Sequence, residues 1–272
     1  RIHNYHFAVY GAMFLGQYEP ALAAAQELID VTPEDLLRVP SPPMADYFES
    51  YFAIRDHVLI RFGRWREIID LPMPEDPALF ANLTAVRHYA KGVAHAALGE
   101  VDAAEEQQRL FLAAGDRVPE GRLMHNVRCH QQLAVAEEML AGEIDYRKGH
   151  FDSGFAHLRR AIALEDALPY DEPWGWMQPT RHALGALLLE QNRVEEAEAV
   201  YREDLGLGGT LPRAQIHPDN VWSLRGLTDC LTRRGASDSP EGRLLAQRLD
   251  LANARADRPV RASCFCAQAA AE

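Results

Sequence analysis

The sequence lacks long apolar runs, clusters of basic residues and closely spaced groups of cysteines, and each absence excludes a class of protein. No stretch of about 18 consecutive apolar residues occurs, so we expect no membrane-spanning helix. The formal charge is −12, from 28 Lys and Arg against 40 Asp and Glu, and no basic stripe is present, which argues against nucleic-acid binding. Four cysteines do not make a disulfide framework in a chain of this length, which predicts a reducing, cytoplasmic location.

The motifs of common enzyme classes are also missing. The glycine-rich segment 206–209 is not followed by Lys and Ser or Thr, so it does not form a phosphate-binding loop. Neither a G-x-S-x-G nor an H-E-x-x-H pattern occurs. The chain begins with Arg1 at the foot of an expected helix and shows no export signal, so we expect further residues upstream of Arg1.

What the sequence does contain is a recurring helix–turn–helix pattern. A small turn residue is followed by an apolar or aromatic residue and, three positions further on, usually by a small one. The turn residues are spaced at roughly 36 to 50 residues, which is the signature of stacked helical hairpins. The five clearest turn residues are Gly16, Gly63, Gly99, Gly149 and Asn192.

The pattern resembles the tetratricopeptide repeat. In the first copy the spacings of Gly16, Tyr18, Ala21 and Pro33 are similar to the small, aromatic and terminal-proline positions of that family. The resemblance implies an all-α, right-handed superhelix of about six hairpins with a concave inner face. We assign residues 1–258 to this repeat domain and residues 259–272 to an irregular C-terminal tail.

Several local features follow from the same pattern. Gly92 and Gly185 are predicted at close helix–helix contacts, where a side chain would hold two helices apart. Long helices are predicted over residues 44–62 and about 120–148, and the second would place His125 and Cys129 on one face. Pro259 ends the last helix, so the tail is predicted to run extended, either over the surface or back into the groove.

The repeat register implies which side chains line the concave face. The positions that lie a fixed number of residues before each turn residue are occupied by histidines, tyrosines and charged residues. A groove for an acidic peptide tail would instead repeat Lys, Arg and Asn at these positions, and no such repeat occurs. These side chains either form a solvated groove or converge on a polar pocket, and Trp176 either caps the apolar seam between repeats or forms a wall of that pocket. The predicted set is His3, His6, Tyr10, His57, Arg61, Tyr89, Glu143, Tyr146, Arg147, Trp176, His182 and Glu190.

Two cysteines near the C-terminus invite a metal hypothesis. Cys264 and Cys266 form a C-x-C pair, which suits a soft metal or a redox pair, although two thiolates complete no tetrahedral site. If the tail enters the groove, histidines there could complete a zinc or copper site; if it does not, the two cysteines are small packing residues. We therefore expect a binding or scaffold protein for a protein or peptide partner. The alternative is a small-molecule or metal-binding protein, with or without enzymatic activity.

Overall fold

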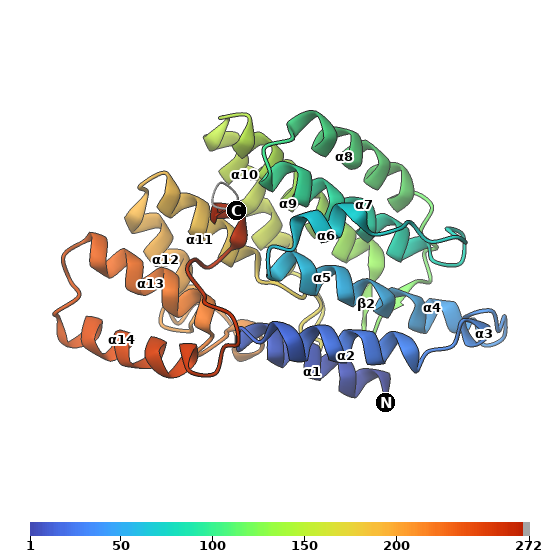
Figure 1. The fold of residues 1–272 in the computed structure, drawn as a ribbon, viewed down its shortest axis with the longest axis horizontal. Helices are drawn as coiled ribbons and strands as arrows, with labels where there is room; N and C mark the ends of the chain where they lie inside the picture. Colours follow the sequence, from blue (N-terminus) through green and yellow to red (C-terminus); the bar gives the residue numbers. More distant parts are fainter. Residues whose placement is uncertain (269–272) are drawn as a thin grey trace.

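The protein is almost entirely helical in the computed structural model, which describes residues 1–268. Six helical hairpins follow one another along the chain (Figure 1). In chain order the pairs are α1 (Ile2–Phe14) with α2 (Tyr18–Asp30), α5 (Ile54–Arg61) with α6 (Trp65–Asp70), α7 (Ala81–Ala97) with α8 (Val101–Gly115), α9 (Cys129–Arg147) with α10 (Phe151–Asp166), α11 (Thr180–Glu190) with α12 (Val194–Asp204), and α13 (Val221–Arg233) with α14 (Pro240–Asn253).

Each hairpin turns at a residue in the left-handed region of backbone space. The five turn residues predicted from the sequence all have φ between 57° and 80°, and the sixth hairpin turns at Gly235 with φ of 67°. Glycine adopts this conformation without a steric penalty, and asparagine tolerates it better than most residues, which explains why Asn192 replaces glycine at one turn. The predicted hairpin register is therefore confirmed at these turns.

The connecting segments differ from the sequence prediction in two places. The helix predicted over 44–62 is divided into α4 (Met44–Phe48), the 3-10 helix η1 (Glu49–Ala53) and α5, and a short α3 (Glu34–Leu37) precedes it. The helix predicted from about 120 begins only at Cys129, because β1 (Leu123–Met124) and β2 (Val127–Arg128) form a small antiparallel hairpin first. His125 lies in its turn with φ of 52°, so His125 and Cys129 do not share a helical face.

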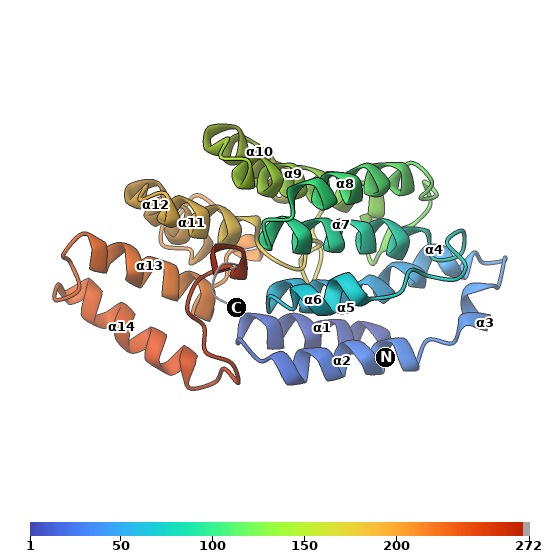
Figure 2. The same cartoon turned by 45° about the horizontal axis from the view of Figure 1, so that its top comes forward.

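The hairpins curve round until the sixth meets the first (Figures 1 and 2). The Trp222 indole N–H donates to the Met13 carbonyl at 2.8 Å, which joins α13 to α1. Asp257, just beyond α14, accepts the backbone N–H groups of Tyr18 and Glu19 at 2.7 and 2.8 Å, so it satisfies free donors at the start of α2. The two ends of the helical array are thus tied together.

Two irregular segments fill the space that the hairpins surround. The segment 173–179, between α10 and α11, is buried along its whole length. The C-terminal tail runs from Asp257 into the middle of the molecule, where the short 3-10 helix η3 (Phe265–Gln268) packs against α11 (Figure 1). Of the two courses predicted for the tail, the groove is the one found. None of the helices within residues 1–268 is both long and apolar enough to cross a lipid bilayer.

Close packing between helices depends on glycine at several positions. A Cβ atom at Gly92 of α7 would lie 2.9 Å from both terminal methyl carbons of Leu140, which confirms the predicted contact. Gly185 of α11 and Gly226 of α13 both face Tyr201 of α12, and a Cβ atom at either would lie within 2.5 Å of its ring. Tyr201 therefore occupies a slot that two glycines leave open.

Replacing Gly185 with alanine should destabilise the protein by about 1–3 kcal/mol, because the added carbon overpacks the Tyr201 slot. Gly11 is a matched control: it lies in the middle of α1 with no atom within 4 Å of an added Cβ, so Gly11→Ala should be neutral or stabilise by about 0.5–1 kcal/mol. Denaturant unfolding of both variants measures the difference. Equal effects at the two positions would contradict the packing described here.

Candidate functional site

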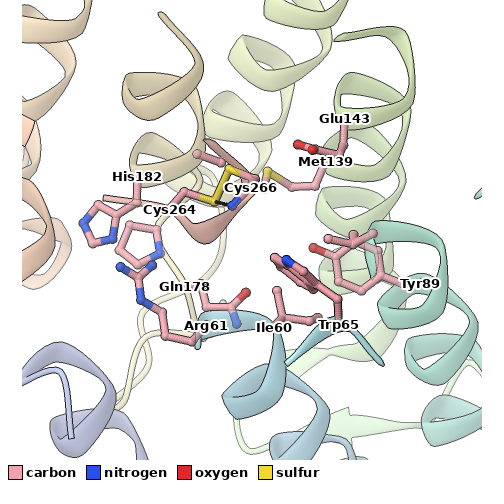
Figure 3. Close-up of a pocket in the computed structure, with 13 residues that line it drawn as sticks. Ile60, Arg61, Trp65, Tyr89, Met139, Glu143, Gln178, His182, Cys264 and Cys266 are labelled. Atoms are coloured by element: carbon pink, nitrogen blue, oxygen red, sulfur yellow. Dashed lines mark hydrogen bonds between the residues drawn. A yellow bond between two sulfur atoms is a disulfide. The ribbon is translucent and has the colours of Figure 1, made fainter. Parts of the chain in front are cut away.

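The centre of the molecule holds a small cavity between the helices and the tail. Its volume is about 40 Å³, room for a few water molecules at most, whereas pockets for drug-sized ligands measure about 300–1,000 Å³. Figure 3 shows side chains from α5, α7, α9, α11 and the tail converging on it. Those relevant to function are Arg61, Tyr89, Met139, Glu143, His182, Cys264 and Cys266.

The predicted concave-face residues divide into three groups. Arg61, Tyr89, Glu143 and His182 line the cavity, as the register implied. His6 and His57 also point inward, but segment 173–179 covers them. The remaining predicted residues do not line the cavity, and Glu190 is exposed.

The covered histidines are packed as core residues. The His6 Nε2 atom lies 3.1 Å from the Met177 sulfur, and His57 meets the Trp176 ring edge-on at 5.1 Å between centroids. Trp176 also contacts Tyr89 at 5.8 Å, so its role is to pack the interior. Burial lowers the pKa of His6 to about 3 and that of His57 to about 4, because a charged imidazole loses its hydration there.

Other predicted residues are fixed by partners outside the cavity. His3 stacks on His125 with centroids 4.6 Å apart. Tyr146 packs edge-on against Phe151 at 5.0 Å, and its hydroxyl accepts a hydrogen bond from the Gln191 amide at 2.9 Å. These side chains contribute to the packing between repeats and not to a shared pocket.

A buried polar network around Asp204 was not predicted. Asp204 accepts hydrogen bonds from His182 at 2.9 Å, from His217 at 2.8 Å and from Ser223 at 2.5 Å. Burial alone would raise the pKa of Asp204, but the two histidines hold it well below its usual value. Tyr10 extends the network, because its hydroxyl lies 3.1 Å from His217 Nε2. No spacing pattern marks Asp204, which stands at the end of α12 among several other acids.

His182 belongs to this network and is therefore not free to bind a metal through Nε2. Burial lowers its pKa to about 4, so it is neutral, and its Nε2–H donates to Asp204. Its Nδ1 atom is buried without a hydrogen-bond partner. Across residues 1–268, no three or more His, Cys, Asp or Glu side chains converge so as to hold a metal ion. The site of tail cysteines and groove histidines, considered from the sequence, is thus not formed.

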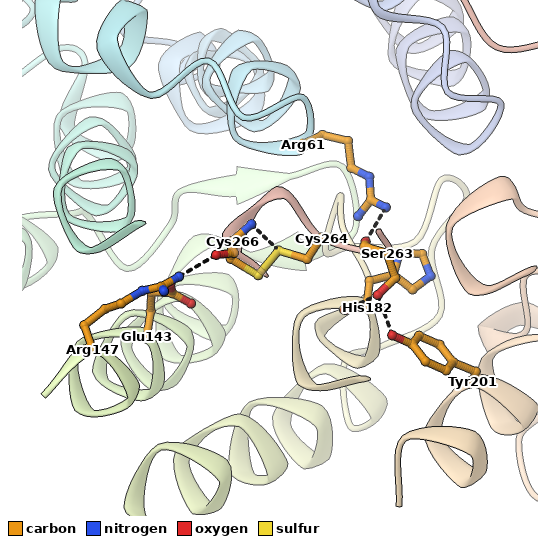
Figure 4. The surroundings of a disulfide bond; sticks show 8 residues. All are labelled: Arg61, Glu143, Arg147, His182, Tyr201, Ser263, Cys264 and Cys266. Carbon is orange, nitrogen blue, oxygen red and sulfur yellow. Dashed lines mark hydrogen bonds and ion pairs between the residues drawn. A yellow bond between two sulfur atoms is a disulfide. The ribbon is translucent and has the colours of Figure 1, made fainter. Parts of the chain in front are cut away.

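The tail is held by groove side chains on both sides of its cysteines (Figure 4). The Arg61 Nη2 atom donates to the Ser263 carbonyl at 3.0 Å, and Arg147 donates to the Cys266 carbonyl while its guanidinium pairs with Glu143 at 2.7 Å. Cys264 and Cys266 are joined to each other by a disulfide. Because this bridge spans only two residues, it fixes the local course of the tail and closes no long loop.

Arg61 is a buried cation with few polar partners. Its guanidinium lies 3.7 Å from the centre of the Trp222 ring, and its Nε atom is buried without a hydrogen-bond partner. Burial lowers its pKa to about 9. Among the described residues no carboxylate forms a salt bridge with it. Arg61 is therefore a buried cation held by a backbone carbonyl and an aromatic face.

Comparisons with known proteins add no assignment. No protein-family model matches the chain, and no curated protein is significantly similar to it. The function must therefore be argued from the geometry of the cavity and the tail.

Replacing His57 with phenylalanine should make stability less sensitive to acid. The unfolded chain binds a proton at His57 near pH 6.5, whereas the folded protein binds it only near pH 4, so the stability that neutral His57 confers is complete above pH 6.5 and is lost as pH falls below it. Between about pH 4.5 and 6, the free energy of unfolding of His57→Phe should fall less steeply than that of the parent protein, by about 1.4 kcal/mol per pH unit. Denaturant melts across this range measure both slopes, and parallel curves would show that His57 binds its proton equally well in the folded and unfolded chain, so that its pKa is not lowered by folding.

Proposed function

We propose that this chain is a tetratricopeptide-like binding protein, located in the cytoplasm, whose concave face binds a peptide segment of a partner protein. The C-terminal tail occupies that face in the structure and serves as a guide to how such a segment is held. The observation that carries the proposal is that arginines from three different hairpins bind backbone carbonyl groups of the tail.

Backbone recognition by the groove is independent of the side chains of the bound segment. Arg61 of α5 binds the carbonyl of Ser263, Arg147 of α9 binds that of Cys266, and Arg225 of α13 binds that of Val260 at 3.2 Å. Every peptide carries these carbonyl groups, and hydrogen bonds from charged donors are stronger than neutral ones. This arrangement suits a segment that, like the tail, runs irregularly past Arg225 and Arg61 and then forms a short 3-10 turn at Arg147.

Two positions of the tail also contact the groove through their side chains. The Ser263 hydroxyl lies 2.6 Å from the Tyr201 hydroxyl and donates to the His182 carbonyl at 2.8 Å. Phe265 packs edge-on against Trp222 at 6.1 Å and lies so close to Gly63 that a Cβ there would be 2.7 Å from it. These contacts favour a segment with a small hydroxyl residue followed, two positions later, by an aromatic residue.

A peptide competition experiment tests the proposal. The probe is a fluorescent peptide with the sequence of residues 259–268 and serine in place of both cysteines, which separates peptide binding from sulfur chemistry. In the parent protein the tethered tail competes at an effective concentration on the order of millimolar. The double variant Ser263→Ala/Phe265→Ala weakens that competitor, so it should bind the peptide at least about tenfold more tightly than the parent, as measured by fluorescence anisotropy.

Arg225→Ala, made in the Ser263→Ala/Phe265→Ala background, tests whether the arginine–carbonyl contacts contribute to peptide binding. It removes one carbonyl contact from the partly buried rim of the groove, so it should weaken peptide binding while circular dichroism stays unchanged. If the loosened variant does not bind the peptide at all, the tail is a structural part of the core and the groove is not a peptide site.

A further inference from the structure

Three sulfur-containing side chains line the central cavity. Cys264, Cys266 and Met139 all line it, and the Met139 thioether points from α9 toward the two tail sulfurs (Figure 3). The Cys266 backbone N–H donates to the Cys264 sulfur at 3.2 Å, which holds the turn that places both cysteine sulfurs on the same side. Cys266 is almost fully buried, whereas Cys264 is partly exposed and therefore open to reagents.

The cavity is also lined by a positively charged side chain, that of Arg61. Arg61 is a buried cation that forms no salt bridge in the described part of the chain, although the Asp204 carboxylate acts on it at longer range, and it lines the same cavity as both cysteines. A buried charge is costly unless an opposite charge accompanies it. When the disulfide is reduced, cysteine thiolates are groups that can supply that negative charge beside Arg61.

Ligand type and charge together select the metal. Zinc needs four nitrogen, sulfur or oxygen ligands, and the described residues offer no suitable group of three or more His, Cys, Asp or Glu side chains. Cu(I) prefers thiolate and thioether sulfur and accepts few ligands. One Cu(I) with two thiolates carries a net charge of −1 and so places an anion in the cavity that Arg61 lines, whereas a divalent ion with the same ligands would be neutral and add no such attraction.

We propose that the reduced Cys264 and Cys266 thiolates, with the Met139 thioether as third ligand, form a Cu(I) site for which Arg61 is the counter-cation. This goes beyond peptide binding and does not depend on it. An external thiol of the glutathione class first reduces the disulfide: two thiols become one external disulfide, the Cys264–Cys266 bond breaks, and each sulfur receives a proton. Cu(I) then displaces both protons to solvent and bonds to both sulfurs.

Titration of the full chain with Cu(I) tests this. The protein is reduced with dithiothreitol, desalted without oxygen and titrated in competition with bathocuproine disulfonate. We expect one Cu(I) per reduced chain, none in the oxidised chain, and an X-ray absorption spectrum with sulfur as the only near neighbour. Met139→Leu should bind about tenfold more weakly, since loss of one supporting group commonly costs a metal site that much.

Control variants separate the site from general effects. Cys264→Ser/Cys266→Ser should lose binding with an unchanged circular dichroism spectrum. Met124→Leu changes a buried methionine outside the cavity, and Cys129→Ala/Cys230→Ala removes the two free cysteines, so both should bind as the parent does. Copper retained by the Cys264→Ser/Cys266→Ser variant, or no copper bound by the reduced parent protein, would overturn the assignment. An unchanged affinity in Met139→Leu would remove the thioether from the ligand set.

Discussion

The contact between the first and last hairpins determines the character of the whole interior. Trp222 bonds to the end of α1 and Asp257 binds the start of α2, so the two ends of the array are held together. The face that would otherwise form an open groove thereby becomes an enclosed space. Everything that lies in that space, including the histidines of the first two hairpins, has to be packed and hydrogen-bonded as core.

The enclosed space explains why irregular backbone is found at the centre of a helical protein. Backbone polar groups buried away from water need partners, and side chains provide them here. Gln132 donates to the Gly175 carbonyl, and Arg61 and Arg147 donate to carbonyl groups of the tail. In return, Gln178 of the first segment donates to the His57 carbonyl of α5. Three polar residues of the inner face thus act as hydrogen-bond donors to the two segments that fill it.

The features that could be predicted from the sequence are local. A turn that requires positive φ restricts the residue type, so Gly16 and Asn192 could be recognised from spacing alone, and Gly185 could be placed at a helix contact from the repeat pattern. The end of α4 before Glu49 could not be predicted, because it depends on a partner that is distant in the sequence. Its carboxylate accepts the Leu83 backbone N–H at 2.8 Å and pairs with Arg122 at 2.7 Å.

For the candidate site, the direction of side chains along each helix was predictable, whereas the segments that cover them were not. The register correctly directed Tyr89, Glu143 and His182 toward one cavity, because side-chain direction follows helical position. Segment 173–179 covers His6 and His57 through contacts between residues more than a hundred positions apart. No spacing pattern in the sequence indicates such contacts. Cys264 and Cys266 were recognisable as a pair, but their neighbour Met139 could be identified only once the tail was placed.

The tie between the two ends also changes how the molecule responds to force and heat. In a stack of hairpins with free ends, each repeat contacts only its neighbours, so each terminal repeat has a single neighbour and can unfold first. Here Trp222 and Asp257 link the last described hairpin to the first, so neither end of the described array is without a neighbour. Opening the array at this junction requires the loss of the Trp222–Met13 hydrogen bond and of the two hydrogen bonds that Asp257 accepts.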